Sequence, residues 1–185
     1  MRRALLFTLL IATLGTGSAF AQSDLGMKSV GVAAGYVSPE DLDGTFSIGV
    51  FADHGTIVPN LGLESRIDFW STSEEAFGTE VSIRDIAIGA RTKYYFEVAH
   101  PSLRPFAGAG LALHLLHAEV TIPAMPGFPE QSFDDSETKL GLDIGGGINM
   151  PMNPRWDFNG ELWYGIVSDV GQFSLRAGFG YKLGS

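Results

Sequence analysis

Apolar and polar residues alternate without exception along the stretch Phe173 to Leu183, which reads FSLRAGFGYKL. The odd-numbered residues are all apolar, and the even-numbered residues are polar or glycine. Because successive side chains of a β-strand point to opposite faces, this pattern predicts a strand between two different environments. A soluble sheet places its apolar face on a protein core. A transmembrane barrel strand places it on lipid and turns the polar face inward.

Seven further segments share the pattern. They are Met27 to Val37, Thr45 to His54, Leu61 to Ser71, Arg84 to Phe96, Leu103 to His117, Lys139 to Met150 and Arg155 to Ser168. Eight is an even number, and each segment has about ten residues that could cross a bilayer when tilted. We therefore predict an all-β fold, an eight-stranded antiparallel up-and-down transmembrane β-barrel with sequential strand pairing.

The alternation slips just before the fourth segment. Val81 and Ile83 occupy one parity, whereas Ile86 and Ile88 occupy the other. A β-bulge would produce such a slip, and so would a strand whose outer end leaves the bilayer.

The expected connections alternate in length. The short ones are Gly55 to Asn60, Glu97 to Ser102 and Pro151 to Pro154. The mostly longer loops are Ser38 to Gly44, Thr72 to Thr79 and Glu119 to Ser136, with a short link near Asp169 to Gly171 as the exception. Short turns on one side and longer loops on the other are typical of outer-membrane barrels. With the N-terminus in the periplasm, the longer loops are expected to face outward.

The N-terminus has the features of a secretory signal peptide. Arg2 and Arg3 form a positive region, Ala4 to Leu14 is apolar, and Ala19-Phe20-Ala21 is a small-residue cleavage site. The apolar run is too short to span a bilayer, which requires roughly 20 residues. We predict a signal peptide over residues 1–21 and one outer-membrane β-barrel domain over residues 22–185.

The face opposite the apolar one carries ten charged residues, five of each sign. They are Glu64, Arg66, Asp68, Arg91, Lys93, Asp143, Asp157, Glu161, Arg176 and Lys182. Burial of an unpaired charge costs several kcal/mol, so a narrow lumen requires these groups to pair. We expect opposite signs to meet between neighbouring strands, with Glu64, Arg66 and Asp68 facing Arg91 and Lys93, and Asp157 and Glu161 facing Arg176. Many glycines share this face and leave room for large side chains.

Aromatic residues mark the apolar face near the strand ends. They are Tyr36, Phe69, Tyr94, Phe96, Trp156, Phe158, Tyr164, Phe179 and Tyr181. Such positions suggest interfacial girdles, although aromatic residues are also common in ordinary strands. The chain has no cysteine, so disulfides cannot stabilise it. Without Arg2 and Arg3, 10 basic residues remain against 21 acidic ones, a balance that excludes a nucleic-acid partner.

Three stretches resemble the small outer-membrane β-barrel proteins, the opacity-type and OmpA-like barrels. The stretches are RPFAGAGLAL (Arg104 to Leu113), KLGLDIGGGINMPMNPRWDFNGELWY (Lys139 to Tyr164) and the closing LRAGFGYKL. The resemblance covers nearly all of the predicted mature chain and implies an outer-membrane location with barrel-assembly machinery as an insertion partner. One departure concerns the terminal aromatic residue that this machinery reads, because Tyr181 is followed here by Lys182-Leu183-Gly184-Ser185.

Candidate chemistry is sparse. Lipid A-modifying barrels use a histidine with a serine or an acid, but no serine stands two residues from His114 or His117, which parity places inward and outward. His54 and His100 are expected near the periplasmic side. Gly145-Gly146-Gly147 precedes no helix, so it does not indicate a phosphate loop. Acids in the outward loops could bind Ca²⁺, although solvated loop acids are more common. These acids are Asp41, Asp43, Asp134, Asp135 and Glu137. We expect no catalytic residue, metal or cofactor.

The sequence favours a non-enzymatic barrel with an envelope-structural or surface-interaction role, a lumen plugged by charges, outer-membrane lipid and lipopolysaccharide as partners, and a monomeric state. Two alternatives remain. One is a channel or transporter for small hydrophobic molecules, and the other is a lipid A-modifying enzyme.

Overall fold

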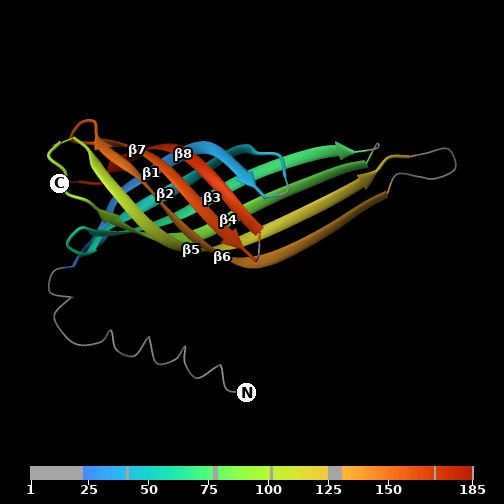
Figure 1. Ribbon diagram of the computed structural model, residues 1–185, viewed down its shortest axis with the longest axis horizontal. Helices are drawn as coiled ribbons and strands as arrows, with labels where there is room; N and C mark the ends of the chain where they lie inside the picture. The colour runs from blue at the N-terminus through green and yellow to red at the C-terminus, as the bar shows by residue number, and fades with distance from the viewer. Residues whose placement is uncertain are drawn as a thin grey trace, which may run out of the picture.

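The computed structural model describes residues 23–40, 42–76, 79–100, 102–124, 131–168 and 170–184. The predicted signal peptide lies outside the described residues. Eight strands account for most of the chain (Figure 1). They are β1 (Asp24–Pro39), β2 (Thr45–Val58), β3 (Leu61–Ala76), β4 (Thr79–Tyr95), β5 (Arg104–Ile122), β6 (Gln131–Pro151), β7 (Trp156–Val167) and β8 (Val170–Lys182). The described residues contain no helix that is long and apolar enough to cross a membrane.

The sheet closes on itself. Each strand pairs antiparallel with the next in sequence, and β1 pairs with β8 from Ser29 opposite Lys182 to Pro39 opposite Gln172. Closure gives every strand two neighbours within the barrel, so its backbone groups are bonded without water. The predicted eight-stranded antiparallel up-and-down barrel is confirmed.

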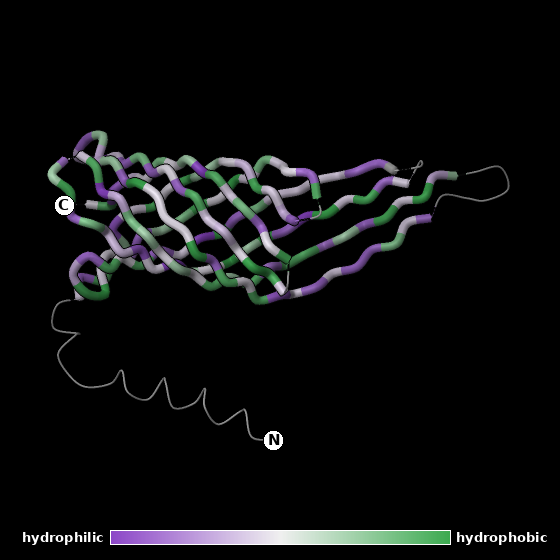
Figure 2. Tube along the Cα trace, viewed as in Figure 1, coloured by the Kyte–Doolittle hydropathy of each residue, from purple (hydrophilic) through white to green (hydrophobic). Residues whose placement is uncertain are grey.

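The two faces of the barrel wall have the predicted polarity. Val32, Val50, Leu111, Leu142 and Ile144 are each more than half exposed on the outer face. Figure 2 shows hydrophobic and hydrophilic residues interspersed along the strands rather than gathered into long blocks. The nine aromatic residues expected on the outer face do not lie among the buried core residues, and three ring pairs join them: Tyr94 with Phe96, Trp156 with Tyr181, and Phe158 with Phe179. This outer surface suits lipid rather than water.

The connections at the end of the barrel where β1 begins and β8 ends, the terminal end, have two to eight residues, and those at the opposite end are no longer, so the predicted contrast in loop length is not borne out. In the β2–β3 turn, Val58 pairs with Leu61, so only Pro59 and Asn60 connect the strands. Proline fixes the first turn residue, and Asn60 adopts a φ of 65°, a conformation that asparagine tolerates. The other two connections span residues 96–103 and 152–155.

The opposite end of the molecule, the hairpin end, differs from the expectation. Thr72 to Thr79 and Glu119 to Ser136 are not mainly loops, because β3 runs to Ala76, β4 starts at Thr79, β5 runs to Ile122 and β6 starts at Gln131. Figure 1 shows these four strands continuing well past the ends of β1, β2, β7 and β8. We call residues 71–76, 79–84, 117–122 and 131–136 the extension. Its strands persist because the period-2 alternation persists, with its phase reversed.

The parity slip near Ile83 has a simple origin. The pairing of β4 with β3 and with β5 shows no register shift, so no bulge interrupts this strand. The outer face changes from apolar at Ile86 to polar at Arg84, and the inner face becomes apolar at Ile83. The strand keeps its direction while its surroundings change, as expected for an outer end that leaves the bilayer.

Candidate functional site: a charge cluster inside the barrel

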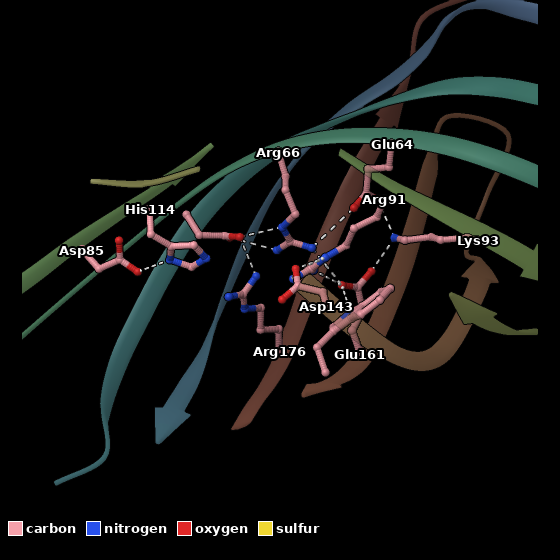
Figure 3. Close-up of polar contacts among 11 residues, drawn as sticks. Glu64, Arg66, Asp85, Arg91, Lys93, His114, Asp143, Glu161 and Arg176 are labelled. Carbon is pink, nitrogen blue, oxygen red and sulfur yellow. Dashed lines mark hydrogen bonds and ion pairs between the residues drawn. The ribbon is translucent and has the colours of Figure 1, made fainter. Parts of the chain in front are cut away.

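Eight of the ten predicted lumen charges form one cluster across the bore (Figure 3). We call this group the central cluster. It consists of Glu64, Arg66, Asp68, Arg91, Lys93, Asp143, Glu161 and Arg176. Each of these side chains is at most 8 % exposed. The residues come from β3, β4, β6, β7 and β8, so the cluster connects opposite walls of the barrel.

Arg66 lies at the centre of the network. Its Nε and Nη2 donate to the two carboxylate oxygens of Asp68, at 2.6 and 2.9 Å. Its Nη1 donates to Glu161 Oε2 at 3.1 Å and lies 3.4 Å from Glu64 Oε1. The planar guanidinium therefore contacts three carboxylates, a geometry that a lysine could not reproduce.

Lys93 and Arg91 use the remaining carboxylate positions. Lys93 Nζ donates to Glu64 Oε2 at 2.5 Å and to Glu161 Oε1 at 2.6 Å. Arg91 donates to Asp143 Oδ2 through Nε and Nη2, at 3.1 and 2.7 Å. Arg91 Nη1 also lies 3.7 Å from Glu161 Oε2. Glu161 thus links β7 to cations on β3 and β4.

The expected pairing between neighbouring strands holds only in part. Glu64 and Lys93 do meet between β3 and β4. Arg176, however, donates to Asp68 Oδ2 at 2.6 Å on β3 instead of pairing with Glu161, its register partner on β7. Glu161 already accepts hydrogen bonds from Arg66, Lys93 and Trp163, so its carboxylate is occupied, and Arg176 reaches across the bore to Asp68.

Asp157 and Lys182 lie apart from the cluster. They form their own ion pair at 2.9 Å, and the side chains are 16 % and 37 % exposed. Their strands meet near the terminal end, where Trp156 lies opposite Tyr181. This pair is partly solvated and is expected to contribute little to stability.

Aromatic side chains complete the packing, and the sequence analysis did not identify them as lumen residues. Trp163 is 1 % exposed, donates its indole N–H to Glu161 Oε2 at 3.0 Å, and lies 4.0 Å under the guanidinium of Arg91. Lys93 Nζ lies 4.9 Å from the ring of Phe106. Trp163 lies two residues from Glu161 and therefore on the same face of the strand, and this parity could have identified it as a lumen residue.

A second buried pair lies on the hairpin side of the cluster. His114 points inward as predicted, and its Nδ1 lies 2.6 Å from Asp85 Oδ2. Both residues are at most 2 % exposed. Asp85 was missed, although it shares the parity of Arg91 and Lys93. Predicting its contact with His114 requires the register of β4 against β5, in which Asp85 lies opposite Leu116, and the sequence alone does not give that register.

The charges of the central cluster balance, with four cations and four carboxylates. Balance alone would not compensate for desolvation, but here every carboxylate accepts hydrogen bonds from at least one cation. A cavity of about 10 Å³ remains beside Arg91, His114 and Arg176. The bore at this level is therefore occupied by side chains.

The other chemical candidates are dispersed. His54 Nε2 lies 2.8 Å from Ser65 Oγ, and His117 Nδ1 lies 2.7 Å from Ser136 Oγ on the outer face. Of the candidate Ca²⁺ ligands, Asp41 lies outside the described residues, and Glu137 forms an ion pair with Lys139. Within the described ranges, no group of three or more histidines and acids could hold a metal ion.

The closed eight-stranded barrel, with a lipid-compatible outer face and a charged interior, defines a membrane β-barrel of the small outer-membrane type. Residues 7–182 match the family described as outer membrane protein beta-barrel domain, and the chain belongs to this family. It is accordingly an outer-membrane protein. No curated protein sequence matches the chain.

Several solved structures are similar to this chain. Neisserial surface protein A (NspA) is 21 % identical, with a TM-score of 0.58 over 84 % of this chain and 95 % of that one. A major outer membrane protein from Thermus thermophilus is 13 % identical, with a TM-score of 0.63 over 85 % and 98 %. The attachment invasion locus protein Ail of Yersinia pestis is 14 % identical, with a TM-score of 0.53 over 85 % and 100 %. At these identities the likeness concerns the fold.

Proposed function

We propose that this protein is a non-enzymatic outer-membrane barrel whose lumen is closed and whose function resides in its outward-facing surface. The observation that carries the proposal is the central cluster. Arg66, Arg91 and Arg176 reach acids on other strands and occupy the bore, so the barrel serves as a rigid support for what projects from it. Ion pairs of this kind stabilise a closed lumen because opening it would leave several buried charges unpaired.

The transporter alternative is less well supported. A hydrophobic solute that crossed the bore would have to pass the eight charges of the central cluster and the Asp85–His114 pair. It would displace ion pairs without replacing their hydrogen bonds, which is unfavourable. The apolar side chains that face inward in the wall, such as Val37, Phe106 and Trp163, are packed and buried, so they line no open apolar path.

The proposed orientation places the terminal end in the periplasm and the extension outside. It is supported by the predicted signal peptide, with cleavage after Ala21, and by the projection of the extension from the opposite end, since the longer hairpins of outer-membrane barrels face outward. The apolar outer face would then be covered by outer-membrane lipid and lipopolysaccharide. At the hairpin-side boundary lies a hollow of about 350 Å³ lined by Arg84, Ile86, Leu115, Leu116, His117, Ser136, Glu137 and Thr138. Arg84 could contact a lipid phosphate there, since Glu137 is already paired with Lys139. Insertion would require barrel-assembly machinery, and the protein would function as a monomer.

Planar-bilayer recording tests the closed lumen. The purified protein should show no steady conductance, because the central cluster occupies the bore. A stable conductance in the nanosiemens range would contradict the proposal and would favour the channel alternative. Arg176→Ala removes one cation of the central cluster, and any effect on conductance is compared with that of Lys28→Ala, because the ion pair of Lys28 with exposed Asp24 lies outside the cluster.

Cysteine labelling on intact cells tests the orientation. The sequence contains no native cysteine, so any label on the protein reports the introduced one. Ser132→Cys lies on the outer face of β6 in the extension, and Ser102→Cys lies in the connection of residues 96–103 at the terminal end. A membrane-impermeant maleimide should label only Ser132→Cys. Labelling of Ser102→Cys alone would reverse the orientation, and labelling of neither would place the extension away from the exterior.

A second candidate function rests on the contact between His117 and Ser136. A histidine beside a serine hydroxyl at the membrane boundary could hydrolyse an ester of a lipid, with Ser136 as nucleophile and His117 as base. In the described part of the chain, no carboxylate contacts the other ring nitrogen of His117, so the orienting group of a triad is missing. Mass spectrometry of lipid A decides between the two functions. The same acyl pattern in cells with the parent protein and in cells with Ser136→Ala would support the non-enzymatic function. An ester-cleaved species that is present with the parent and lost with Ser136→Ala would support the enzyme.

A further inference from the structure

The inner face of the extension is apolar in the middle and acidic at both edges. Across β3, β4, β5 and β6 the rows, from the last one of the wall outward, are Trp70, Asp85, Leu116, Glu137, then Thr72, Ile83, Ala118, Asp135, then Glu74, Val81, Val120, Phe133. Residues opposite each other in antiparallel strands point to the same side, so each row shares a face. In the two rows beyond the wall, the apolar residues belong to β4 and β5, with Phe133 beside them on β6, and one acid lies on each edge strand, Glu74 on β3 and Asp135 on β6.

No opposing wall covers this face. Among the described residues, β2 pairs with β3 only as far as Trp70, and β7 pairs with β6 only from Gly141. Figure 1 shows the four strands extending past the ends of the rest of the barrel. The side chain of Phe133 is 59 % exposed as a result. The neighbouring residues Val81, Ile83 and Val120 are half-buried. An apolar strip that no opposing wall covers suggests an interaction surface.

The outer face of the same four strands is polar throughout. Its rows are Ser71, Arg84, His117, Ser136, then Ser73, Ser82, Glu119, Asp134, then Glu75, Glu80, Thr121, Ser132. If the extension only projected into water, no physical requirement would place valine and isoleucine on one particular face. The segregation indicates that the inner face has its own partner.

Charge identifies the class of that partner. Two of the six carboxylates of the extension face inward, and these two, Glu74 and Asp135, flank the apolar rows from the two edges. Both are exposed, although Glu74 Oε1 also accepts the backbone N–H of Asp43 at 3.0 Å. A polyanion would be repelled, and an uncharged apolar molecule would make no use of the acids. A partner with an apolar stripe between two cationic flanks satisfies both features.

The dimensions fit an amphipathic helix. From Leu116 to Ile122 the apolar strip covers six steps of about 3.4 Å, or about 20 Å, the length of a helix of about 13 residues. The edge strands β3 and β6 are three strand spacings apart, about 14 Å, whereas a helix with its side chains is about 10–12 Å wide. Lysine or arginine side chains on both flanks would therefore reach the acids.

We propose that the inner face of the extension binds a cationic amphipathic helix of a partner peptide or protein. The inference rests on the proposed function, because it requires the extension to face the exterior. It deepens that function by giving the chemistry of the partner: leucine-like side chains against Val81, Val120 and Phe133, and cations beside Glu74 and Asp135.

The test uses the full mature barrel in phosphatidylcholine nanodiscs and a fluorescent peptide of about 14 leucines and lysines with the leucines on one helical face. The parent should bind it above the level of empty nanodiscs, more weakly as salt rises, and should not bind the same peptide with glutamate for lysine. Val81→Thr with Val120→Thr should weaken binding about tenfold through lost apolar contact. The outer-face change Thr121→Val is the control and should leave binding unchanged.

The charge pairs provide a matched comparison. Glu74→Gln with Asp135→Asn should weaken binding about fivefold, since two exposed ion pairs are lost. Glu75→Gln with Asp134→Asn removes the same charge from adjacent residues of the outer face and should have little effect. Equal effects of the two double variants would overturn the proposal, as would binding of the glutamate peptide or dimerisation of the barrel through this face in place of peptide binding. The labelling of Ser132→Cys on intact cells tests the orientation independently of peptide binding. If Ser132→Cys is not labelled, the proposed function is rejected, whereas the result of the binding measurement still stands.

Discussion

The barrel wall and the extension are built from the same strands but have opposite polarity. Within the wall, β5 presents Leu111 and Leu113 outward and His114 inward, whereas beyond the wall it presents His117 outward and Val120 inward. The register of β4 with β5 continues through the change without a shift. The comparison teaches that the phase of the alternation reports the solvent on each face, while its period reports the strand itself.

The two regions also treat charge differently. In the wall, Arg66 is 5 % exposed and contacts three carboxylates, so each charge depends on the others. In the extension the acids are exposed to water and do not form such a network; Ser132, for example, donates to Glu119. Charge stabilises the wall only as a complete set, whereas in the extension it remains available for a partner.

The largest expected effect is the loss of a cation from the wall. Arg176→Ala should destabilise the barrel by about 3–5 kcal/mol, because Asp68 loses one of its two cationic partners in a buried site. Lys28→Ala removes an exposed ion pair with Asp24 and should cost at most about 1 kcal/mol. Urea titration of the barrel refolded into lipid vesicles measures both. An Arg176→Ala protein as stable as the parent would indicate a wet, open lumen.

The next effect compares the outer faces of the two regions on one strand. Leu142→Arg places a charge on the lipid-facing wall and should destabilise by about 2–4 kcal/mol if the residue lies near the bilayer midplane. Ser132→Arg, on the same face of β6 but in the extension, should change stability by less than about 0.5 kcal/mol. The same titration applies. Similar losses for both variants would place the extension within the membrane.

A smaller effect is expected where the wall meets the extension. His114→Ala leaves Asp85 buried without its partner and should cost about 1–3 kcal/mol. The site is tightly packed, since a Cβ on Gly141 would lie 2.7 Å from His114 Nε2. His117→Ala, three residues further along β5 and outward, loses only the contact with Ser136. If His114→Ala and His117→Ala lowered the free energy of unfolding equally in urea titrations, the boundary between wall and extension would not lie between the two residues.

The barrel could be predicted from sequence because a membrane strand repeats one simple pattern. The last four segments, from Leu103 onward, show it with few interruptions, and all ten predicted lumen charges lie on the polar face of their strands. The extension was expected to be loop because its apolar residues face inward. Val81 and Ile83 have the parity of the inner face, whereas a strand in lipid would present its apolar residues on the outer face. Their pattern is compatible with a strand that projects beyond the lipid.

The contacts inside the bore were less predictable. Parity shows that Arg176 faces inward, but its contact with Asp68 on β3 depends on how far a side chain reaches across a closed barrel. The Asp85–His114 pair likewise depends on the exact stagger of β4 against β5. Trp163 was missed for another reason: an aromatic residue next to Tyr164 suggests lipid, whereas its parity places it among the charges.

The smallest effect concerns the apolar face of the extension. Val81→Thr with Val120→Thr should change the free energy of unfolding by less than about 1 kcal/mol, because no opposing wall packs on these half-buried side chains and water can reach the new hydroxyl groups. Val37→Thr makes the same chemical change on the inner face of β1, where the side chain is fully buried, and should cost about 1–3 kcal/mol through an unsatisfied hydroxyl. Urea titration of the two proteins separates the cases. A large loss from the extension variant would mean that its valines form part of the folded core; a small one leaves recognition, rather than stability, as the reason for their placement.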